Sequence, residues 1–206
     1  MNSTNIEHIR LGKLEVFYGP MYSGKTDALT YRLNPLEHIP GGDFLFFRPL
    51  SDNREERKSP FSTAFIPDNN PEAILDLLNR KSSKDIRVVA IDEVQFFSEN
   101  IEKVIENLVR KNYNVIVAGL NLDFRGEPFG QMGRIITRAD YPTLCRQAIC
   151  KYNNCGQTAT RTQRLINGKP ASYFDIIKST EGSRPEEKYE PRCVEHHFIL
   201  DSPAIK

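Results

Sequence analysis

The sequence predicts an α/β fold in which helices cover a parallel central sheet and a small C-terminal domain follows. Short apolar runs alternate with helix-like segments, and a glycine-rich loop follows the first apolar run. Near residue 150 the pattern changes to turn residues with spaced cysteines and histidines. We therefore expect a loose N-terminal tail over residues 1–12, an α/β domain over 13–145 and a small domain over 146–206.

The elements of the α/β domain are expected from hydrophobic periodicity. Continuous apolar runs are typical of parallel strands that are buried on both faces. Such runs occupy residues 14–18, 43–47, 86–91, 115–120 and, as a fifth strand, 144–149. Helical spacing of apolar residues predicts helices over 26–33, over 71–78 and over 101–109. Residues 48–70 and the glycine-rich stretch 126–133 lack periodicity, so we expect loops there.

The glycine-rich loop fits G-x-x-x-x-G-K-[ST], the phosphate-binding signature, between a strand and a helix. Its glycines let successive N–H groups face phosphate oxygens. Lys25 is expected to reach the β- and γ-phosphates, and Thr26 to offer its hydroxyl to Mg²⁺. An ordinary glycine turn is the alternative, which the strand–loop–helix context disfavours. We expect the whole loop to bind a nucleoside triphosphate through Gly19, Pro20, Met21, Tyr22, Ser23, Gly24, Lys25 and Thr26.

Two carboxylates, Asp92 and Glu93, follow directly after the strand predicted over 86–91. An acidic residue at this place supports Mg²⁺ in phosphate-loop proteins, and we assign that role to Asp92. Glu93 is expected to act as the general base. Attack by water would make the protein an ATPase, whereas attack by a substrate hydroxyl would make it a kinase. The alternative is that both residues merely cap the next helix.

The C-terminal part carries two pairs of metal-ligand residues, Cys150 with Cys155 and Cys193 with His196. Three thiolates and one imidazole suit a tetrahedral Zn²⁺ site, and four protein ligands make it structural rather than catalytic. His197 is the alternative to His196 as the fourth ligand. The other hypothesis is that these are ordinary thiols beside a chance pair of histidines.

Composition limits the classes of function. The chain has 206 residues with a formal net charge of +1, which predicts no binding to nucleic acid or to an anionic membrane. The first ten residues are polar and lack the apolar region of a signal peptide. Four cysteines in such a chain favour metal binding over disulfides, and Cys145 lies in an apolar run typical of a core. We expect a cytoplasmic protein.

Five strings in a characteristic order carry a family resemblance: GPMYSGKT at 19–26, AIDEVQFF at 90–97, FRGEPFG at 124–130, ATRTQRLINGKPASY at 159–173 and YEPRC at 189–193. Over residues 14–197 the chain resembles the thymidine kinases of the zinc-containing, tetrameric type. The resemblance implies a RecA-like P-loop domain followed by a zinc domain whose lasso loop closes over the nucleoside. It also implies transfer of the γ-phosphoryl group of ATP to the 5′-hydroxyl of thymidine with Mg²⁺, a salvage step in DNA precursor synthesis.

The same resemblance assigns roles to individual residues. Glu93 corresponds to the general base. The residues beside the phosphates and metal are Asp52, Arg54, Asp92 and Gln95. The residues around the nucleoside are Met21, Phe96, Leu120, Phe124, Thr162 and Tyr189. The main chain within residues 173–180 is expected to contact the edges of the base.

The chain departs from the family pattern at two places that bear on these assignments. The first cysteine pair is Cys-x₄-Cys where the family usually has Cys-x₂-Cys, and the lasso is lengthened over residues 179–188. Two other functions remain as alternatives to the kinase. One is a RecA-like ATPase that nucleic acid stimulates, and the other is a nucleotide-binding module without catalysis.

Overall fold

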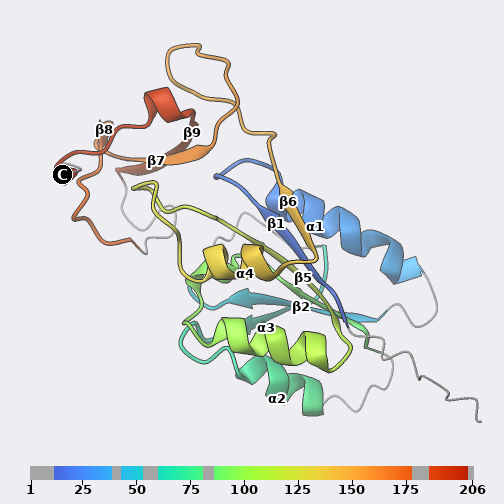
Figure 1. Ribbon diagram of the computed structural model, residues 1–206. Helices are drawn as coiled ribbons and strands as arrows, with labels where there is room; N and C mark the ends of the chain where they lie inside the picture. Colours follow the sequence, from blue (N-terminus) through green and yellow to red (C-terminus); the bar gives the residue numbers. More distant parts are fainter. Residues whose placement is uncertain (1–11, 39–42, 53–59, 81–85, 178–185, 204–206) are drawn as a thin grey trace, which may run out of the picture.

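The computed structural model describes residues 12–38, 43–52, 60–80, 86–177 and 186–203 of the chain. A six-stranded sheet forms the body of the molecule, and a smaller three-stranded sheet lies in a separate C-terminal lobe (Figure 1). The strands of the large sheet are β1 (Leu14–Tyr18), β2 (Phe44–Pro49), β3 (Thr63–Ile66), β4 (Val88–Ile91), β5 (Asn114–Gly119) and β6 (Tyr141–Leu144).

The large sheet has the strand order β3-β2-β4-β5-β1-β6, and each neighbouring pair is parallel. β1 lies between β5 and β6, with Leu14 opposite Val115 and Glu15 opposite Tyr141. The predicted α/β fold with a parallel central sheet is therefore confirmed. In such a sheet the loops that follow the strands meet at one edge, which is where ligands bind. The loop after β1 and the carboxylates after β4 meet there.

Helices cover both faces of the large sheet. The helices are α1 (Lys25–Leu33), α2 (Ala73–Arg80), α3 (Ile101–Arg110) and α4 (Met132–Arg138), with short 3₁₀ turns η1 (Asn34–His38), η2 (Val94–Phe96) and η3 (Val194–His196). Apolar side chains of α2, α3 and α4 pack with Val16, Val89 and Val115 in one cluster. On the other face, α1 packs with Phe17 and Ile116. Burial on both faces explains why these strands lack polar alternation.

Three expectations about the elements were wrong. The predicted loop 48–70 contains β3, a four-residue edge strand that is too short to produce a periodic pattern. The fifth strand runs over Tyr141–Leu144 instead of 144–149, and it includes Pro142, which an edge strand tolerates because one side needs no donor. The predicted loop 126–133 overlaps the start of α4. Gly133 and three β-branched residues give this helix a low intrinsic helix propensity, so the sequence did not indicate it.

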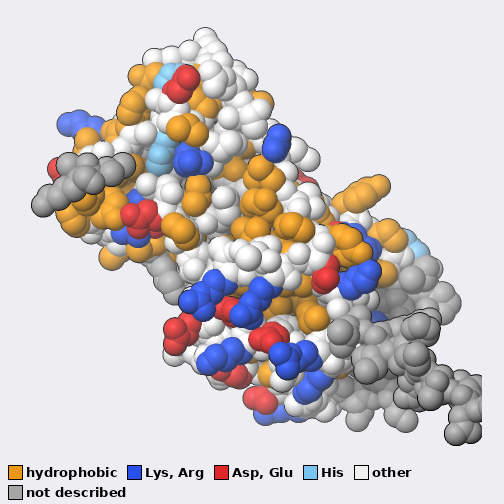
Figure 2. All heavy atoms as spheres, in the orientation of Figure 1, with side chains coloured by type: hydrophobic (Ala, Val, Ile, Leu, Met, Phe, Trp, Pro, Cys, Tyr) orange, Lys and Arg blue, Asp and Glu red, His pale blue; other side chains and the backbone are white. Residues whose placement is uncertain are grey.

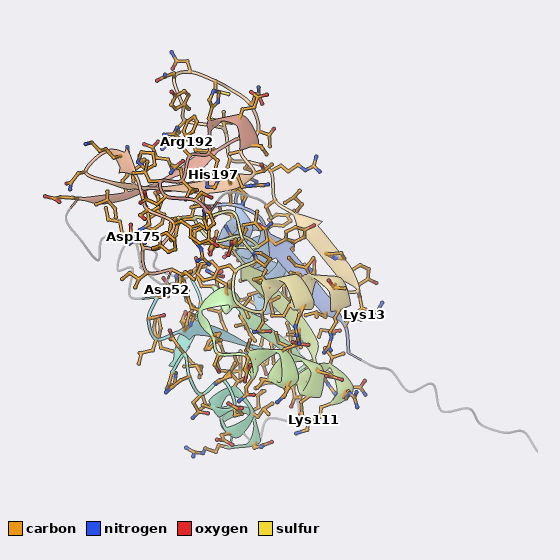
Figure 3. All side chains as sticks on the ribbon, turned by 60° about the vertical axis from the view of Figure 1, so that its left-hand side comes forward. Lys13, Asp52, Lys111, Asp175, Arg192 and His197 are labelled. Atoms are coloured by element: carbon orange, nitrogen blue, oxygen red, sulfur yellow. The ribbon has the colours of Figure 1, made fainter. Side chains whose placement is uncertain are left out.

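The C-terminal lobe contains an antiparallel sheet of β7 (Arg161–Ile166), β8 (Lys169–Pro170) and β9 (Glu187–Arg192). The sequence indicated turns and no helix there, and it did not predict these strands. Arg192 and His197 lie in this lobe, whereas Lys111 lies at the opposite end of the molecule (Figure 3). The division of the chain at 145/146 stays a prediction; β6, the last strand of the large sheet, ends at Leu144.

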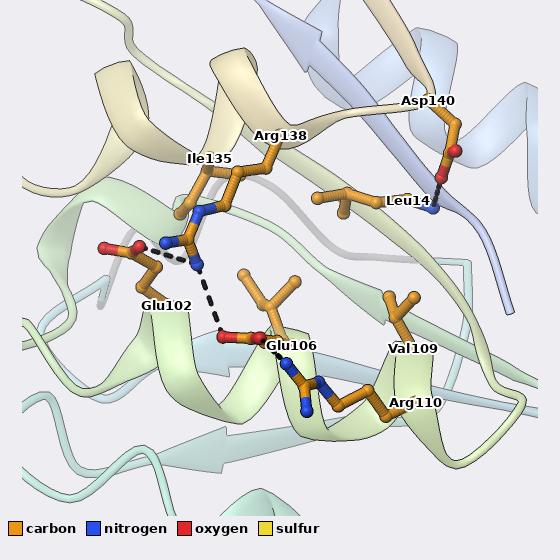
Figure 4. Close-up of a pocket in the computed structure, with 9 residues that line it drawn as sticks. Leu14, Glu102, Glu106, Val109, Arg110, Ile135, Arg138 and Asp140 are labelled. Carbon is orange, nitrogen blue, oxygen red and sulfur yellow. Dashed lines mark hydrogen bonds and ion pairs between the residues drawn. The ribbon is translucent and has the colours of Figure 1, made fainter. Parts of the chain in front are cut away.

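Charged side chains gather over α3 and α4 on the face that Figure 2 shows. They border a cavity of about 240 Å³ between these helices, where Arg138 pairs with Glu102 at 2.9 Å and with Glu106 at 3.3 Å (Figure 4). None of the predicted site residues lines this cavity. Among the described residues, we find no helix that combines the length and the apolar character needed to cross a bilayer.

Candidate active site

The glycine-rich loop connects β1 to α1 in the way that phosphate binding requires. Gly24, directly before α1, has a φ of 83°, a left-handed conformation that glycine adopts without strain. A side chain there would also collide with Gln147, because its Cβ would lie 2.3 Å from the Gln147 Oε1. Both constraints make a glycine necessary at this position.

Two polar side chains of the loop, Lys25 and Ser23, are buried and have defined positions in the structure. The Lys25 Nζ donates a hydrogen bond of 2.7 Å to the carbonyl of Pro20, within the loop itself. The hydroxyl of Ser23 is buried and has no hydrogen-bond partner among the described residues. A buried hydroxyl without a partner costs about 1–3 kcal/mol, which a bound anion would offset. The loop therefore fits a phosphate group.

Asp92 and Glu93 lie at the carboxyl end of β4, beside the start of α1. The Thr26 hydroxyl donates to the Asp92 Oδ2 at 3.0 Å, and the Glu93 N–H donates to the Asp92 Oδ1 at 2.9 Å. Glu93 has a φ of 52°, which is rare for a residue with a side chain. Strained conformations of this kind are common at functional sites, where the surroundings enforce them.

Burial and the neighbouring Glu93 raise the pKa of Asp92 from 3.8 to about 6, although the Arg48 guanidinium acts in the opposite direction. Arg48 also forms a buried ion pair with Asp52. Asp92 at the end of β4 and Asp52 on the segment after β2 therefore both interact with Arg48. A divalent cation would favour the ionised form of Asp92, so the environment fits a metal ion beside Thr26 and Asp92.

The side chain of Gln95 fixes the carboxylate of Glu93. Its Nε2 donates to the Glu93 Oε2 at 2.6 Å, and its Oε1 accepts the Leu120 N–H at 3.0 Å. Gln95 is almost completely buried. Gly119, the last residue of β5, makes room for this amide, since a Cβ there would lie 2.6 Å from the Gln95 Oε1. The Glu93 side chain is thus tied to the end of β5.

An apolar cluster lies next to Glu93, between the large sheet and the C-terminal lobe. η2 directly follows Glu93 and places Phe96 edge-to-face against Phe129, with ring centroids 5.6 Å apart. The buried members of the cluster are Met21, Phe96, Leu120, Phe124, Phe129, Ala171 and Tyr189. Rigid apolar walls with a few polar groups are the usual surroundings of a flat heterocycle. The cluster is therefore suited to a nucleobase.

Polar contacts tie the C-terminal lobe to this cluster. The Met21 N–H, in the phosphate loop, donates to the Thr162 hydroxyl at 3.0 Å. The Tyr173 hydroxyl donates to the Glu127 Oε1 at 2.5 Å, while the Arg125 guanidinium lies over the Tyr173 ring at 4.9 Å. Hydrogen bonding to Glu127 raises the pKa of Tyr173. The lobe is thereby joined to both sides of the candidate site.

The four predicted metal ligands lie together in the C-terminal lobe. The ligand atoms of Cys150, Cys155, Cys193 and His196 lie within 4.8 Å of one another. The Cys155 and Cys193 sulfurs are 3.9 Å apart, and the Cys193 sulfur is 3.2 Å from the His196 Nδ1. Zinc–sulfur bonds of about 2.3 Å in a tetrahedron separate two sulfurs by about 3.8 Å. The cluster therefore fits a tetrahedral Zn²⁺ ion.

The electrostatics of the cluster also suit a cation. Burial by itself raises the pKa of the Cys150 thiol, but hydrogen bonds with the main chain of Cys193 and Tyr152 and with the side chains of His196 and Cys193 together outweigh it and lower that pKa to about 7. A thiolate is the form that binds a metal. His197, the alternative ligand, instead donates its Nε2–H to the Phe124 carbonyl at 2.8 Å. His197 thus connects the lobe to the apolar cluster, while His196 faces the three thiols.

The structure brings most of the predicted site residues together. The phosphate loop, Asp52, Asp92, Glu93 and Gln95 lie at one edge of the large sheet, and the predicted nucleoside wall forms a single cluster beside them, with Thr162 at its margin. Arg54 lies outside the described residues, and so do residues 178–180 of the predicted base-reading segment. The roles of all these residues remain predictions.

Sequence reasoning missed three buried charged residues at the site, namely Arg48, Arg164 and Glu187. Arg48 lies near the end of β2, directly after its apolar residues, and a charged side chain that is buried at such a place needs a partner. The string at 159–173 contains Arg164 in the middle of a strand, but no pattern along the chain predicts its partner Glu187. Only the pairing of β7 with β9 brings the two together.

Comparison with known proteins identifies relatives along almost the whole chain. The family model described as thymidine kinase matches residues 12–197. This range includes the phosphate loop, both carboxylates and the Cys/His cluster. A thymidine kinase of Coprothermobacter proteolyticus is 44% identical over 193 residues, and the alignment covers 91% of each chain.

The raised pKa of Asp92 predicts a pH-dependent effect of Asp92→Asn on stability without ligand or metal. Between pH about 4 and pH about 6 the Asp92 carboxyl group binds more protons in the folded parent than in the unfolded chain, so its contribution to the free energy of unfolding falls as pH rises. Asparagine does not titrate, so we expect the variant to gain up to about 3 kcal/mol relative to the parent between pH 4 and pH 7.5. Urea unfolding without added Mg²⁺ at both pH values measures the difference.

Asp76→Asn, on the exposed face of α2, is the matched control and should show no such gain. An Asp92→Asn difference that is equal at the two pH values would contradict the assigned protonation behaviour.

Proposed function

Since the chain belongs to the thymidine kinase family and is an ATP-dependent kinase that phosphorylates thymidine, we propose that Glu93 is the general base that activates the 5′-hydroxyl. In this proposal the loop at 19–26 binds the triphosphate, and the apolar cluster around Phe96 and Tyr189 binds the thymine and its sugar. The acceptor hydroxyl then lies between these two parts, next to Glu93.

One observation carries the proposal, which is the position of Glu93 relative to both halves of the site. Its main-chain N–H bonds to Asp92, which in turn accepts the Thr26 hydroxyl of the phosphate loop. Its carboxylate bonds to Gln95, one residue before Phe96 of the apolar cluster. A base that links phosphate loop and nucleobase pocket in this way suits transfer between two bound substrates better than hydrolysis in water.

The proposed reaction balances as a single displacement. The 5′-oxygen of thymidine forms a bond to the γ-phosphorus of ATP as the bond from that phosphorus to the bridging β-phosphate oxygen breaks. The hydroxyl proton passes to the Glu93 carboxylate, and ADP leaves with its negative charge. Lys25 neutralises charge on the phosphates, and the ordered loop amides hold the γ-phosphoryl group in line.

Two metal ions complete the proposal. Thr26 and Asp92 would hold Mg²⁺, which neutralises charge on the β- and γ-phosphates when it is bound. Cys150, Cys155, Cys193 and His196 would hold a structural Zn²⁺, supported by the spacing of their ligand atoms. A four-ligand zinc site adds folding energy to a lobe that has little core of its own.

The compartment and the assembly are also proposals. A cytoplasmic location is supported by four cysteines that form no disulfide in the structure and by a cluster that needs reduced thiols. A homotetramer is supported by the family resemblance. We propose no role for nucleic acid or membrane.

A product assay tests the function directly. Purified protein with Mg·ATP and thymidine is expected to form thymidine monophosphate and ADP in equal amounts, measured by ion-exchange chromatography. ADP that forms without phosphorylated thymidine, and that increases when DNA is added, would instead support the nucleic-acid-stimulated ATPase. Neither product would support a binding module.

Glu93→Gln is expected to lower kcat by ~10²–10⁴-fold, because an amide cannot accept the hydroxyl proton. Binding of ATP should stay within about 2-fold, since the loop that holds the phosphates is unchanged. Steady-state kinetics and calorimetric titration with an ATP analogue measure the two effects. Glu99→Gln, an exposed carboxylate six residues further on, is the control. Parent-like turnover of Glu93→Gln would remove Glu93 from its assigned role.

Cys193→Ser is expected to release the structural metal, because it removes a thiolate in contact with two other ligand atoms. Zinc per chain, measured by plasma mass spectrometry, should fall from about one to well below one, and the melting temperature should fall with it. Cys145→Ser removes a thiol outside the cluster and should leave the zinc content unchanged. Equal zinc in parent and Cys193→Ser would show that the ligand assignment is wrong.

A further inference from the structure

The proposed function uses neither of two charged residues that are buried beside the nucleoside pocket, Arg164 of β7 and Glu187 of β9. The Arg164 side chain is fully inaccessible to solvent, and its Nε donates to the Glu187 Oε1 at 2.5 Å. Burying an ion pair costs more solvation than its attraction returns in many proteins, so such a pair is weak evidence for a stabilising role. The contacts of this pair point to another purpose.

Arg164 and Glu187 connect several segments that form the wall of the pocket. The Arg164 Nη1 donates to the Ile176 carbonyl at 2.6 Å, and its guanidinium lies 5.1 Å from the centre of the Phe124 ring. The Glu187 Oε1 that accepts from Arg164 also accepts the Tyr189 hydroxyl at 3.0 Å. One buried pair thus reaches the main chain before residue 178, the aromatic wall and the tyrosine of β9.

The strand register places these groups on the nucleoside side of the small sheet. Arg164 is directly opposite Tyr189, and directly opposed residues of antiparallel strands point to the same face. Thr162, which binds the phosphate loop through the Met21 N–H, shares that face because it is two residues from Arg164. Glu190 lies on the other face, where it pairs with Arg192 at 2.5 Å. The Glu190–Arg192 pair therefore serves as a control for the Arg164–Glu187 pair, because it is also buried but lies on the face away from the apolar cluster.

We propose that the Arg164–Glu187 pair is a positioning device that sets the affinity for the nucleoside. It orients the Tyr189 hydroxyl and holds the main chain at Ile176, directly before Ile177, which packs against the apolar cluster. This inference rests on the proposed function, because it assigns the pair to the nucleoside half of that site.

Replacing both partners of the ion pair by apolar residues separates an effect on thymidine binding from an effect on the stability of the fold. Arg164→Met with Glu187→Leu keeps the volume and removes both charges, which buried pairs tolerate without loss of stability. We expect KM and the calorimetric Kd for thymidine to rise about 10-fold, since the hydrogen bonds that orient Tyr189 and Ile176 are lost. KM for ATP and zinc per chain should stay unchanged. Glu187→Gln keeps an oxygen that both donors can share but removes the negative charge, which weakens both hydrogen bonds, and it should raise the thymidine KM about 3-fold.

Glu190→Gln is the control for Glu187→Gln, and its thymidine KM should stay within about 2-fold of the parent value. A thymidine Kd that is unchanged in the double variant overturns the inference, as does an equal rise in KM for ATP and thymidine. If the double variant does not fold, the thymidine KM of Glu187→Gln compared with that of Glu190→Gln decides.

A failure of the proposed function would give a different result from a failure of this inference. The parent would then bind thymidine without phosphorylating it, and the comparison of thymidine Kd values would still test the role of the Arg164–Glu187 pair. A parent that binds no thymidine overturns the function and the inference together.

Discussion

The hydrogen bond between the Gln95 amide and the Glu93 carboxylate is the constraint on which the rest of the site depends. Glu93 has a left-handed backbone, which costs of order 1 kcal/mol or more for a residue with a side chain. The buried amide bridges that carboxylate to the end of β5, so the strained conformation is held by the body of the fold. A carboxylate fixed in this way needs little reorganisation before it can accept a proton.

The C-terminal lobe supplies the other half of the site and depends on contacts with the body. The small sheet has few apolar residues of its own, and the lobe is joined to the body through Met21 with Thr162, Glu127 with Tyr173, and the Phe124 carbonyl with His197. The Cys/His cluster brings the two ends of the lobe together, since its ligands come from both. The apolar cluster is therefore assembled from segments that are distant in sequence.

Local chemistry made the carboxyl end of the large sheet predictable. The phosphate loop, the Asp92–Glu93 step and the strands that carry them depend on residues adjacent in sequence, and the strand predicted over 14–18 was confirmed at those bounds. The edge strand Thr63–Ile66 was not predicted, because short, half-exposed strands have no distinct hydrophobic periodicity. The contact of Arg164 with Glu187 was not predicted either. It depends on the pairing of β7 with β9, which cannot be inferred from the sequence of either strand.

A crystal structure of the protein with thymidine and a non-hydrolysable ATP analogue tests the central claim most directly. The measured quantity is the distance from the Glu93 carboxylate to the 5′-oxygen of thymidine. The account predicts about 2.6–3.2 Å, with the 5′-oxygen facing the γ-phosphorus. A thymidine bound in the apolar cluster whose 5′-oxygen lies beyond reach of Glu93, either directly or through one water, would contradict it.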